Sequence, residues 1–248
     1  MTPRPLERAL APALAGRRAL VTGASRGIGA AVVRALAEAG VLVAATARAA
    51  DRLAAVIDPL GAGHVAIAAD LMTESGTRAL IHAVEAWAGG APDIIVNNAG
   101  AFAHGRVADQ DPDGFARALR INLEAPFRVV HAFLPAMVAR KSGDMVTVGS
   151  VADKQAFAGN AAYSASKFGL RAVHEVLRVE TRGTGVRAIL VSPSAVDTDI
   201  WAPVESQLGK TFPPRNAMLS AADVARAICF ALSQPAPVTI DELRLTRS

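Results

Sequence analysis

Tyr163 and Lys167 stand four residues apart in the segment Tyr163-Ser-Ala-Ser-Lys167, within a stretch predicted to be helical. On a helix such a pair shares one face, one turn apart. A free phenol has a pKa of about 10, but a nearby cation stabilises the phenolate and lowers that pKa. The pair can therefore act as a general acid/base. The alternative interpretation is a structural tyrosine that happens to lie beside a lysine.

Three glycines, Gly23, Gly27 and Gly29, lie between a short apolar run at 19–21 and a helical pattern that stops at Gly40. In this context the spacing is typical of dinucleotide binding. The first glycine allows a sharp turn, the second lets the backbone approach a pyrophosphate, and the third lets the helix pack closely on the strand. Unpaired N–H groups at the helix N-terminus then face the phosphates. The alternative is a flexible turn without a ligand.

Further polar or glycine-rich sites follow other apolar runs, at Asn97–Gly100, at Ser150 and at Pro193–Thr198. In a parallel sheet with right-handed crossovers, the segments after the strands meet along one edge, where such sheets bind ligands. These sites and the glycine loop are therefore predicted to form a single functional site.

Strand and helix patterns alternate along the chain with no internal repeat or linker. Apolar runs predict strands at 19–21, 41–46, 64–68, 93–96, 145–148, 186–191 and 238–240. Predicted helices include 74–88, 112–140 with Pro126 and Pro135 as breaks or starts, 161–182, and a helix from the Ser220 cap to Leu232. The alternation predicts an α/β fold with one doubly wound parallel sheet and helices on both faces. Residues 1–16 are expected to form a flexible arm and 198–218 a loop over the site.

The composition fits such a sheet and excludes several other classes of protein. Of 248 residues, 52% are hydrophobic but only 4% aromatic, which is typical of a parallel-sheet core built from aliphatic side chains. The net charge is +4, yet the basic residues are scattered, so nucleic acid is not an expected partner. No apolar run reaches the roughly 20 residues of a membrane helix. With one cysteine, Cys229, a cysteine-based metal site is excluded and the cytoplasm is the expected compartment.

Taken together, these motifs resemble the short-chain dehydrogenase/reductase family over residues 17–242. The resemblance rests on Thr22-Gly-Ala-Ser-Arg-Gly-Ile-Gly29, Asp70, Asn97-Asn-Ala-Gly100, Asn122, Ser150, Tyr163-Ser-Ala-Ser-Lys167 and Pro193-x-x-Val-x-Thr198. It implies one Rossmann domain over 17–248 with a seven-stranded parallel sheet. It also implies an oxidoreductase that interconverts a ketone and a secondary alcohol with a nicotinamide cofactor.

The same resemblance assigns roles to four residues. Tyr163 would exchange a proton with the substrate oxygen, and Lys167 would lower the pKa of Tyr163 and bind the nicotinamide ribose. Ser150 would hold the substrate oxygen. Asn122 would anchor a water that links Lys167 to solvent, although it could also cap the helix that follows it.

The cofactor is expected to be NADP(H). An NAD-selective site usually carries a carboxylate after the second strand, where this chain has Ala47, while Arg48 and Arg26 are positioned to bind a 2′-phosphate. With neither arginine engaged, both cofactors would be accepted. The expected cofactor contacts are Gly23, Ser25, Arg26, Gly27, Ile28, Gly29, Arg48, Asp70, Leu71, Asn98, Ala99, Gly100, Tyr163, Lys167, Pro193, Ser194, Val196 and Thr198.

The substrate is expected to be a small carbonyl compound or alcohol in a mostly apolar pocket without clustered arginines. The residues expected to line it are Phe102, His104, Ser150, Val151, Phe157, Ala195 and Trp201. Two departures from the family pattern stand out, Ser194 in place of the usual Gly and a C-terminus without Asp-Gly-Gly, so both a homodimer and a homotetramer remain open. A non-catalytic dinucleotide-binding regulator is the alternative class, but such a protein is expected to lose Tyr163 or Lys167.

Overall fold

The computed structural model describes residues 13–202, 204 and 213–248. Most of the arm predicted at 1–16, and residues 203 and 205–212 of the loop predicted at 198–218, lie outside the described residues. Within the described part of that loop the structure has two short 3₁₀ turns, Asp199–Trp201 and Arg215–Ala217.

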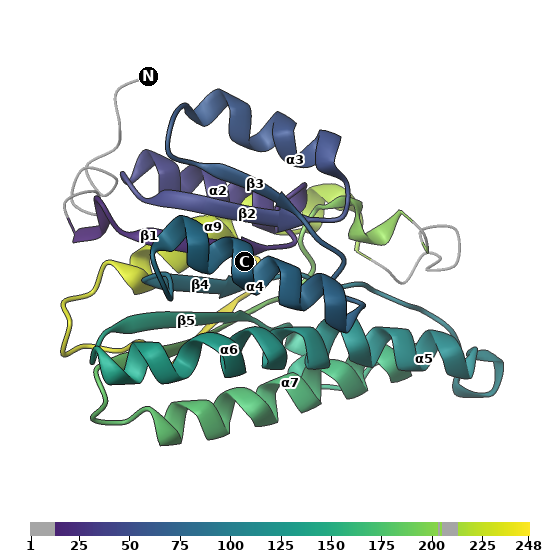
Figure 1. Cartoon of the computed structure of the whole chain (residues 1–248). Helices are drawn as coiled ribbons and strands as arrows, with labels where there is room; N and C mark the ends of the chain where they lie inside the picture. The colour runs from purple at the N-terminus through teal and green to yellow at the C-terminus, as the bar shows by residue number, and fades with distance from the viewer. Residues whose placement is uncertain (1–12, 203, 205–212) are drawn as a thin grey trace.

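A seven-stranded parallel sheet with the order β3-β2-β1-β4-β5-β6-β7 forms the centre of the molecule (Figure 1). Each adjacent pair of strands is parallel, so the predicted fold class is confirmed. The strands are β1 Arg18–Thr22, β2 Leu42–Ala47, β3 Val65–Ala68, β4 Ile94–Asn97, β5 Gly143–Val148, β6 Val186–Pro193 and β7 Glu242–Leu245. The order reverses between β1 and β4, where open sheets of this kind bind ligands.

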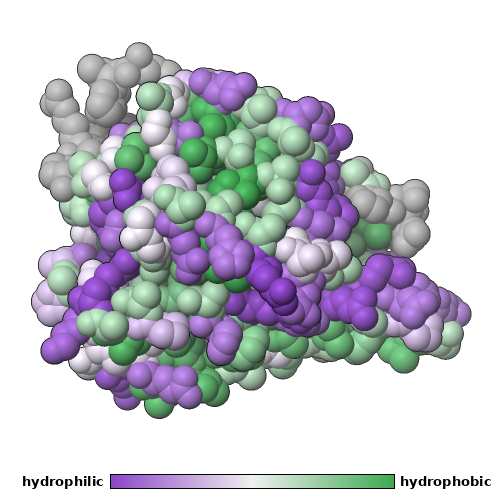
Figure 2. Space-filling model, viewed as in Figure 1, coloured by the Kyte–Doolittle hydropathy of each residue, from purple (hydrophilic) through white to green (hydrophobic). Residues whose placement is uncertain are grey.

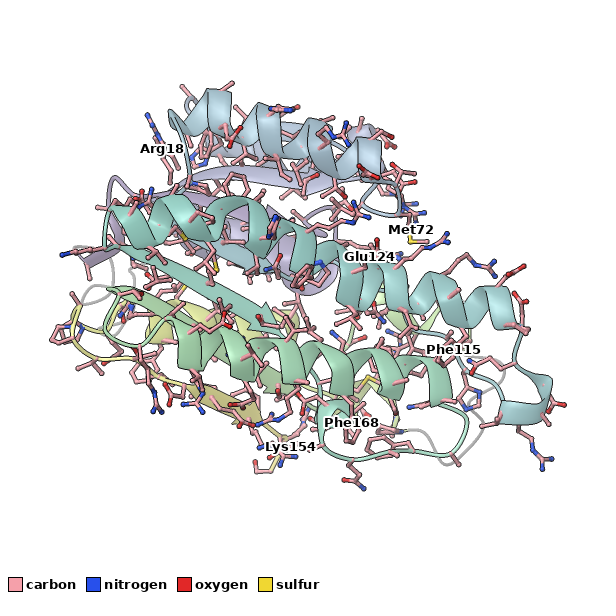
Figure 3. All side chains as sticks on the ribbon, turned by 60° about the horizontal axis from the view of Figure 1, so that its bottom comes forward. Arg18, Met72, Phe115, Glu124, Lys154 and Phe168 are labelled. Carbon is pink, nitrogen blue, oxygen red and sulfur yellow. The ribbon has the colours of Figure 1, made fainter. Side chains whose placement is uncertain are left out.

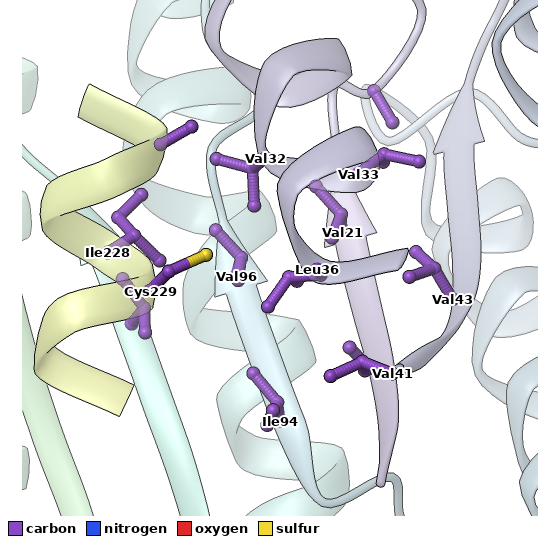
Figure 4. Packing of buried hydrophobic residues seen from close by; sticks show 14 of the residues in the cluster. Val21, Val32, Val33, Leu36, Val41, Val43, Ile94, Val96, Ile228 and Cys229 are labelled. Carbon is purple, nitrogen blue, oxygen red and sulfur yellow. The ribbon is translucent and has the colours of Figure 1, made fainter. Parts of the chain in front are cut away.

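Helices cover both faces of the sheet. They are α2 Gly27–Glu38, α3 Ala50–Ile57, α4 Glu74–Ala88, α5 Pro112–Leu119, α6 Ala125–Ala139, α7 Ala161–Glu180 and α9 Ala221–Leu232. The apolar faces of α2, α3 and α9 form one buried cluster with the sheet, and those of α4, α6 and α7 form the other. Figure 4 shows the first cluster, in which Val32 of α2 faces Ile228 and Cys229 of α9 above Val21 and Val96.

Helix boundaries follow from local sequence. Thr73 accepts a hydrogen bond from the Gly76 N–H and caps α4, which ends at Gly89 in the left-handed conformation. Ser220 and Asp223 form a reciprocal capping box at the start of α9. These caps explain why the predicted helices at 74–88 and after Ser220 have the boundaries seen in the structure.

The stretch predicted at 112–140 is helical, but it is divided into two α-helices. A π-helical segment, Arg120–Glu124, separates α5 from α6. Pro126 has no N–H to donate to the carbonyl four residues back, which favours the widened turn that contains Asn122. Pro126 therefore marks a helix start, as expected, whereas Pro135 lies inside α6 on its exposed side.

The predicted last strand at 238–240 is wrong, because β7 begins at Glu242. Arg187 of β6 donates hydrogen bonds to the carbonyls of Gln234 and Val238 and so holds the preceding connection outside the sheet. Val238 is 43% exposed, while Leu243 and Leu245 pack against the core. The apolar run at 238–240 indicated the right region but the wrong register.

At the amino edge of the sheet, the buried carboxylate of Asp144 is held by two arginines. Arg187 contacts both of its oxygens at 2.5 and 2.8 Å, and Arg17 contacts one at 2.6 Å. Arg187 also donates to the carbonyl of Leu232 at the end of α9. This ionic cluster links β5, β6 and the connection to β7 at the edge opposite the glycine loop.

Candidate active site

A cavity of about 1430 Å³ runs along the carboxyl edge of the sheet. All four sites that were predicted to meet line it, namely the glycine loop, Asn98–Gly100, Ser150 and the segment after β6. Nearly every predicted cofactor residue is in its wall. The exception is Gly29, which lies behind the glycine loop.

The conformation of the glycine loop requires glycine at specific positions. Gly23 and Gly27 have φ values of +66° and +55°, which favour glycine. A Cβ on Gly29 would lie 2.3 Å from the carbonyl oxygen of Gly23, so helix α2 reaches its present position only because residue 29 has no side chain. A cradle of bare backbone at a helix N-terminus fits a pyrophosphate group.

Two polar side chains brace this loop against the segment after β4. The Thr22 hydroxyl accepts hydrogen bonds from the backbone N–H groups of Asn98 and Ala99, both at 3.0 Å. The Asn98 amide donates to the carbonyls of Thr22 and Gly23 at 2.9 and 3.1 Å. Sequence analysis placed Asn98 at the cofactor but missed this bracing, which joins residues 75 or more positions apart.

Tyr163 and Lys167 both lie on α7 and both line the cavity. The Lys167 ammonium is 5.8 Å from the centre of the Tyr163 ring and donates to the Val148 carbonyl at 2.9 Å. Burial lowers the pKa of Lys167 to about 8, while Asp153 opposes that shift. Burial also raises the pKa of the Tyr163 phenol; a hydrogen bond with Ser150 lowers it and the charge of Asp153 raises it further. The phenol is consequently protonated at neutral pH, and the group that lowers its pKa is Ser150 rather than Lys167, the residue expected from the sequence.

Ser150 lies directly after β5 and begins a 3₁₀ turn, Val151–Asp153. Its hydroxyl oxygen accepts a hydrogen bond from the Ala152 N–H at 3.1 Å. Because this bond uses a lone pair rather than the proton, the hydroxyl proton is left for an oxygen in the cavity. The turn therefore presents Ser150 as a donor beside Tyr163.

Asn122 is fully buried beneath the cavity, in the π-helical segment. Its side-chain oxygen accepts from the Ala101 N–H at 2.8 Å, and its amide donates to the Ala101 carbonyl and the Ser166 hydroxyl, both at 2.9 Å. Ser166 in turn donates to the Tyr163 carbonyl at 2.7 Å. The side chain thus ties the segment after Gly100 to α7, and α6 has no side-chain cap. A water at Asn122 would have to use the backbone carbonyl.

Three arginines line the end of the cavity next to β2. Arg26 lies in the glycine loop 3.7 Å from Asp199, Arg48 follows β2, and Arg52 lies on α3. Ala47, the last residue of β2, lines the same end of the cavity and offers no carboxylate. Arg52 was missed by sequence analysis, although its position one helical turn after Arg48 could have identified it.

An aromatic cluster forms the other end of the cavity. The Phe102 ring contacts Tyr163 edge-on at 5.0 Å, Trp201 edge-on at 4.8 Å and His104 at 6.5 Å between ring centres. Trp201 is fixed by a 2.8 Å hydrogen bond from its indole N–H to the Val196 carbonyl. The predicted substrate residues all line the cavity, and so do two arginines that sequence analysis did not anticipate, Arg117 and Arg247.

Ser194, where the family pattern has Gly, also lines the cavity. Its backbone N–H donates to the Leu245 carbonyl at 2.8 Å, so this loop is tied to β7. Thr198 closes the loop over Gly27, where a Cβ would lie 3.0 Å from the Thr198 methyl group.

Among the described residues, no group of three or more histidine, cysteine, aspartate or glutamate side chains could hold a metal ion. Within the same part of the chain, no helix is both long and apolar enough to cross a membrane.

Comparison with known proteins gives consistent results. The family model described as short chain dehydrogenase matches residues 17–209. A glycine betaine reductase of Emericella nidulans is 34% identical over 93% of this chain, and an uncharacterized oxidoreductase of Staphylococcus epidermidis is 30% identical over 92%. A short chain dehydrogenase of Pseudocercospora fijiensis is 36% identical over 77%. The chain spans 18% and 63% of the Emericella and Pseudocercospora proteins but 95% of the Staphylococcus protein.

Solved structures agree. A metagenomic short-chain oxidoreductase in complex with NADP is 32% identical, has a TM-score of 0.81, and covers 95% of this chain and 99% of its own. A serine dehydrogenase complexed with NADP+ has a TM-score of 0.84 at 28% identity, covering 92% of this chain and 94% of its own. The chain belongs to the short-chain dehydrogenase family.

Proposed function

We propose that this protein interconverts a ketone and a secondary alcohol, with Tyr163 as the general acid/base and NADP(H) as the cofactor. The observation that carries the proposal is the meeting of Tyr163, Ser150 and Lys167 in the same cavity as the glycine loop. The backbone cradle and the arginines at its far end fit a nicotinamide dinucleotide, which supplies or accepts the hydride when bound.

In the reductive direction, negative charge develops on the substrate oxygen. The Ser150 hydroxyl and the Tyr163 phenol are both donors beside that position, and two donors aimed at a developing oxyanion stabilise it. Tyr163 then gives up its proton. Because burial raises the pKa of Tyr163, the phenol holds that proton at neutral pH, which suits its role as the acid in ketone reduction.

Lys167 and Asn122 support this pair. Lys167 is buried one turn below Tyr163, and we assign its ammonium to the ribose of the nicotinamide and to stabilisation of the phenolate that forms. Asn122 holds the segment after Gly100 to α7, and its backbone carbonyl is the group that would bind a relay water.

The cofactor preference rests on Ala47, Arg26, Arg48 and Arg52. A guanidinium binds a phosphate bidentately. Because residue 47 is alanine, there is no carboxylate at this position to repel a 2′-phosphate. The solved relatives that contain NADP support this preference. The alternative, a site that accepts both cofactors, applies if the three arginines stay in solvent.

The substrate is a small ketone or alcohol with an apolar or aromatic substituent. Phe102 and Trp201 meet edge-on and form an aromatic wall beside Tyr163, and such a wall favours an apolar group. The named relatives act on dissimilar compounds, among them glycine betaine and serine, so none of them supplies the substrate.

We also propose a homo-oligomer in a reducing cytoplasm. Exposed apolar side chains gather on α6 and α7, at Phe127, Phe168, Val176 and Val179, and Figure 2 shows hydrophobic residues exposed along the lower edge, where α7 lies. The single cysteine, Cys229, is buried, and burial raises its pKa to about 12, so its thiol is unreactive.

The test is turnover of a panel of ketones with NADPH by the wild type and by Tyr163→Phe. The variant should keep the ring packing on Phe102 and bind NADPH nearly as well as the wild type, while kcat falls by about 10²–10⁴-fold. A variant that retained a tenth of wild-type kcat would remove Tyr163 from the proton transfer. A wild type that bound NADPH but reduced no ketone and oxidised no alcohol would favour the non-catalytic regulator.

A further inference from the structure

Asp153 is a buried carboxylate directly behind the proposed catalytic residues, and the proposed mechanism does not use it. The residue is 1% exposed and ends the 3₁₀ turn that Ser150 begins. Carboxylates are almost never buried to this degree unless they are paired. Its surroundings therefore require an explanation.

One oxygen of Asp153 connects two loops of the active site. It accepts hydrogen bonds from the Ser150 N–H at 3.3 Å and from the Ser192 hydroxyl at 2.5 Å. Ser192 directly precedes Pro193 and Ser194, which line the cavity. A Cβ on Gly149 would lie 2.5 Å from this oxygen, so the strand end leaves room for the carboxylate.

The other oxygen of Asp153 faces Arg171. Among the described residues no hydrogen-bond partner reaches this oxygen, but the Arg171 guanidinium lies 3.5 Å away, one turn of α7 beyond Lys167. Arg171 is held in turn by Glu242 of β7 at 2.8 Å and by Glu175 at 3.2 Å. Glu242 also binds Lys154 at 2.8 Å. A chain of alternating charges thus runs from behind Ser150 to Lys154 at the edge of the molecule, below α7 in Figure 3.

The charge of Asp153 reaches both residues of the proton-transfer pair. The charge of Asp153 raises the pKa of Tyr163, although burial and the Ser150 hydrogen bond have larger effects on that pKa. The same charge raises the pKa of Lys167, against the larger effect of burial. Burial lowers the pKa of His174, on the same helix, to about 4, so that imidazole is neutral. The remaining charged or titratable groups around the pair and around Asp153 are His104, Lys154, Arg171, Glu175, Arg178, Asp241 and Glu242.

We propose that Asp153 is a positioning residue that fixes Ser150 and the loop after β6 in one arrangement and, compensated by Arg171, sets the pH at which Tyr163 exchanges its proton. The inference rests on the proposed role of Tyr163. Asp153 touches neither substrate nor cofactor. It acts through the Ser150 N–H, the Ser192 hydroxyl and its own charge.

The test compares pH profiles of kcat for alcohol oxidation, in which Tyr163 must act as the phenolate. Asp153→Asn removes a negative charge, so the limb on which kcat rises with pH, which reports deprotonation of Tyr163, should move to lower pH by about 0.5–1 unit. Arg171→Gln leaves Asp153 uncompensated, so the limb should move upward. Glu242→Gln leaves Arg171 free to pair more closely with Asp153, so the limb should move slightly to lower pH. Asp153→Asn should also lower kcat at its optimum while the Kd for NADPH changes less than about twofold.

Asp144→Asn is the matched control, because it also removes a buried carboxylate held by arginine but at the opposite edge of the sheet. It should lower Tm and leave the limb in place. Shifts of the same sign in Asp153→Asn and Arg171→Gln, or no shift in either, overturn the inference. If Asp153→Asn does not fold, an unmoved limb in Arg171→Gln overturns it alone. A wild-type limb that Tyr163→Phe does not abolish refutes the proposed function instead.

Discussion

Side-chain chemistry at the two ends of the cavity separates two questions, how a proton moves and which dinucleotide is bound. Tyr163, Ser150 and Lys167 address the first, and their properties depend on burial as much as on identity. The raised pKa of Tyr163 shows this, because desolvation outweighs the Ser150 hydrogen bond that lowers it. Arg26 and Arg48 address the second.

The cofactor preference can be tested by single substitutions at these residues. Two charge-assisted contacts of about 1.5–3 kcal/mol each would favour NADPH over NADH by at least about 10- to 100-fold in kcat/KM. Arg48→Ala should lose most of that preference, and Ala47→Asp should reverse it by adding a carboxylate beside the 2′ position. Arg34→Ala, on α2 but outside the cavity wall, serves as the control. A wild type that favours NADH would contradict the assignment of Arg26, Arg48 and Arg52 to the 2′-phosphate.

At the scale of helices and strands, positions follow from short patterns and deviations follow from long-range contacts. The glycine spacing, the caps at Thr73 and Ser220, and the apolar runs of β1 to β6 predict the sheet and most helix boundaries. The register of β7 depends on Arg187, which reaches carbonyls more than 40 residues away. The same holds for Asp153, whose partners Arg171 and Ser192 lie on α7 and β6. No local pattern in the sequence reveals such pairings.

The contact between α2 and β1 predicts a specific effect of Gly29→Ala. The new methyl group would meet the Gly23 carbonyl oxygen at 2.3 Å and the Asn98 amide at 2.6 Å, so α2 must move away from the loop. The Kd for NADPH should rise by at least about tenfold, with a fall in Tm. In Gly114→Ala on α5 the nearest atoms are side-chain atoms of Asp111 and Arg117, at 3.3 and 3.4 Å, and helix propensity favours alanine. Equal effects of the two changes would disprove the packing argument.

Across the whole molecule, the apolar side chains that remain exposed are distributed unevenly. Figure 3 shows α6 and α7 side by side, and Phe168 is labelled on α7. Phe168, Val176 and Val179 are 43%, 56% and 58% exposed on that single helix. Such a surface is typical of an interface between subunits.

The expected assembly can be broken by charge. Val176→Lys together with Val179→Lys should shift the protein toward the monomer in light scattering coupled to size-exclusion chromatography, because burying two unpaired ammonium groups is unfavourable. Phe230→Lys on α9, at a site 41% exposed on the other side of the sheet, should leave the assembly unchanged. A wild type that is monomeric at micromolar concentration, or a double variant that assembles like the wild type, would rule out α7 as the interface.

The ionic cluster of Asp144, Arg17 and Arg187 has a consequence for how this scaffold tolerates variation. It joins β5, β6 and the connection to β7 at the edge farthest from the cavity, so part of the stability of the fold resides where no ligand binds. Segments that are at least partly exposed at the opposite edge, such as 102–104 and 155–158, can then change in sequence without loosening the sheet. Libraries randomised at these loops should yield mostly folded variants with altered substrate range, whereas equal diversity around Asp144 should yield mostly unfolded ones.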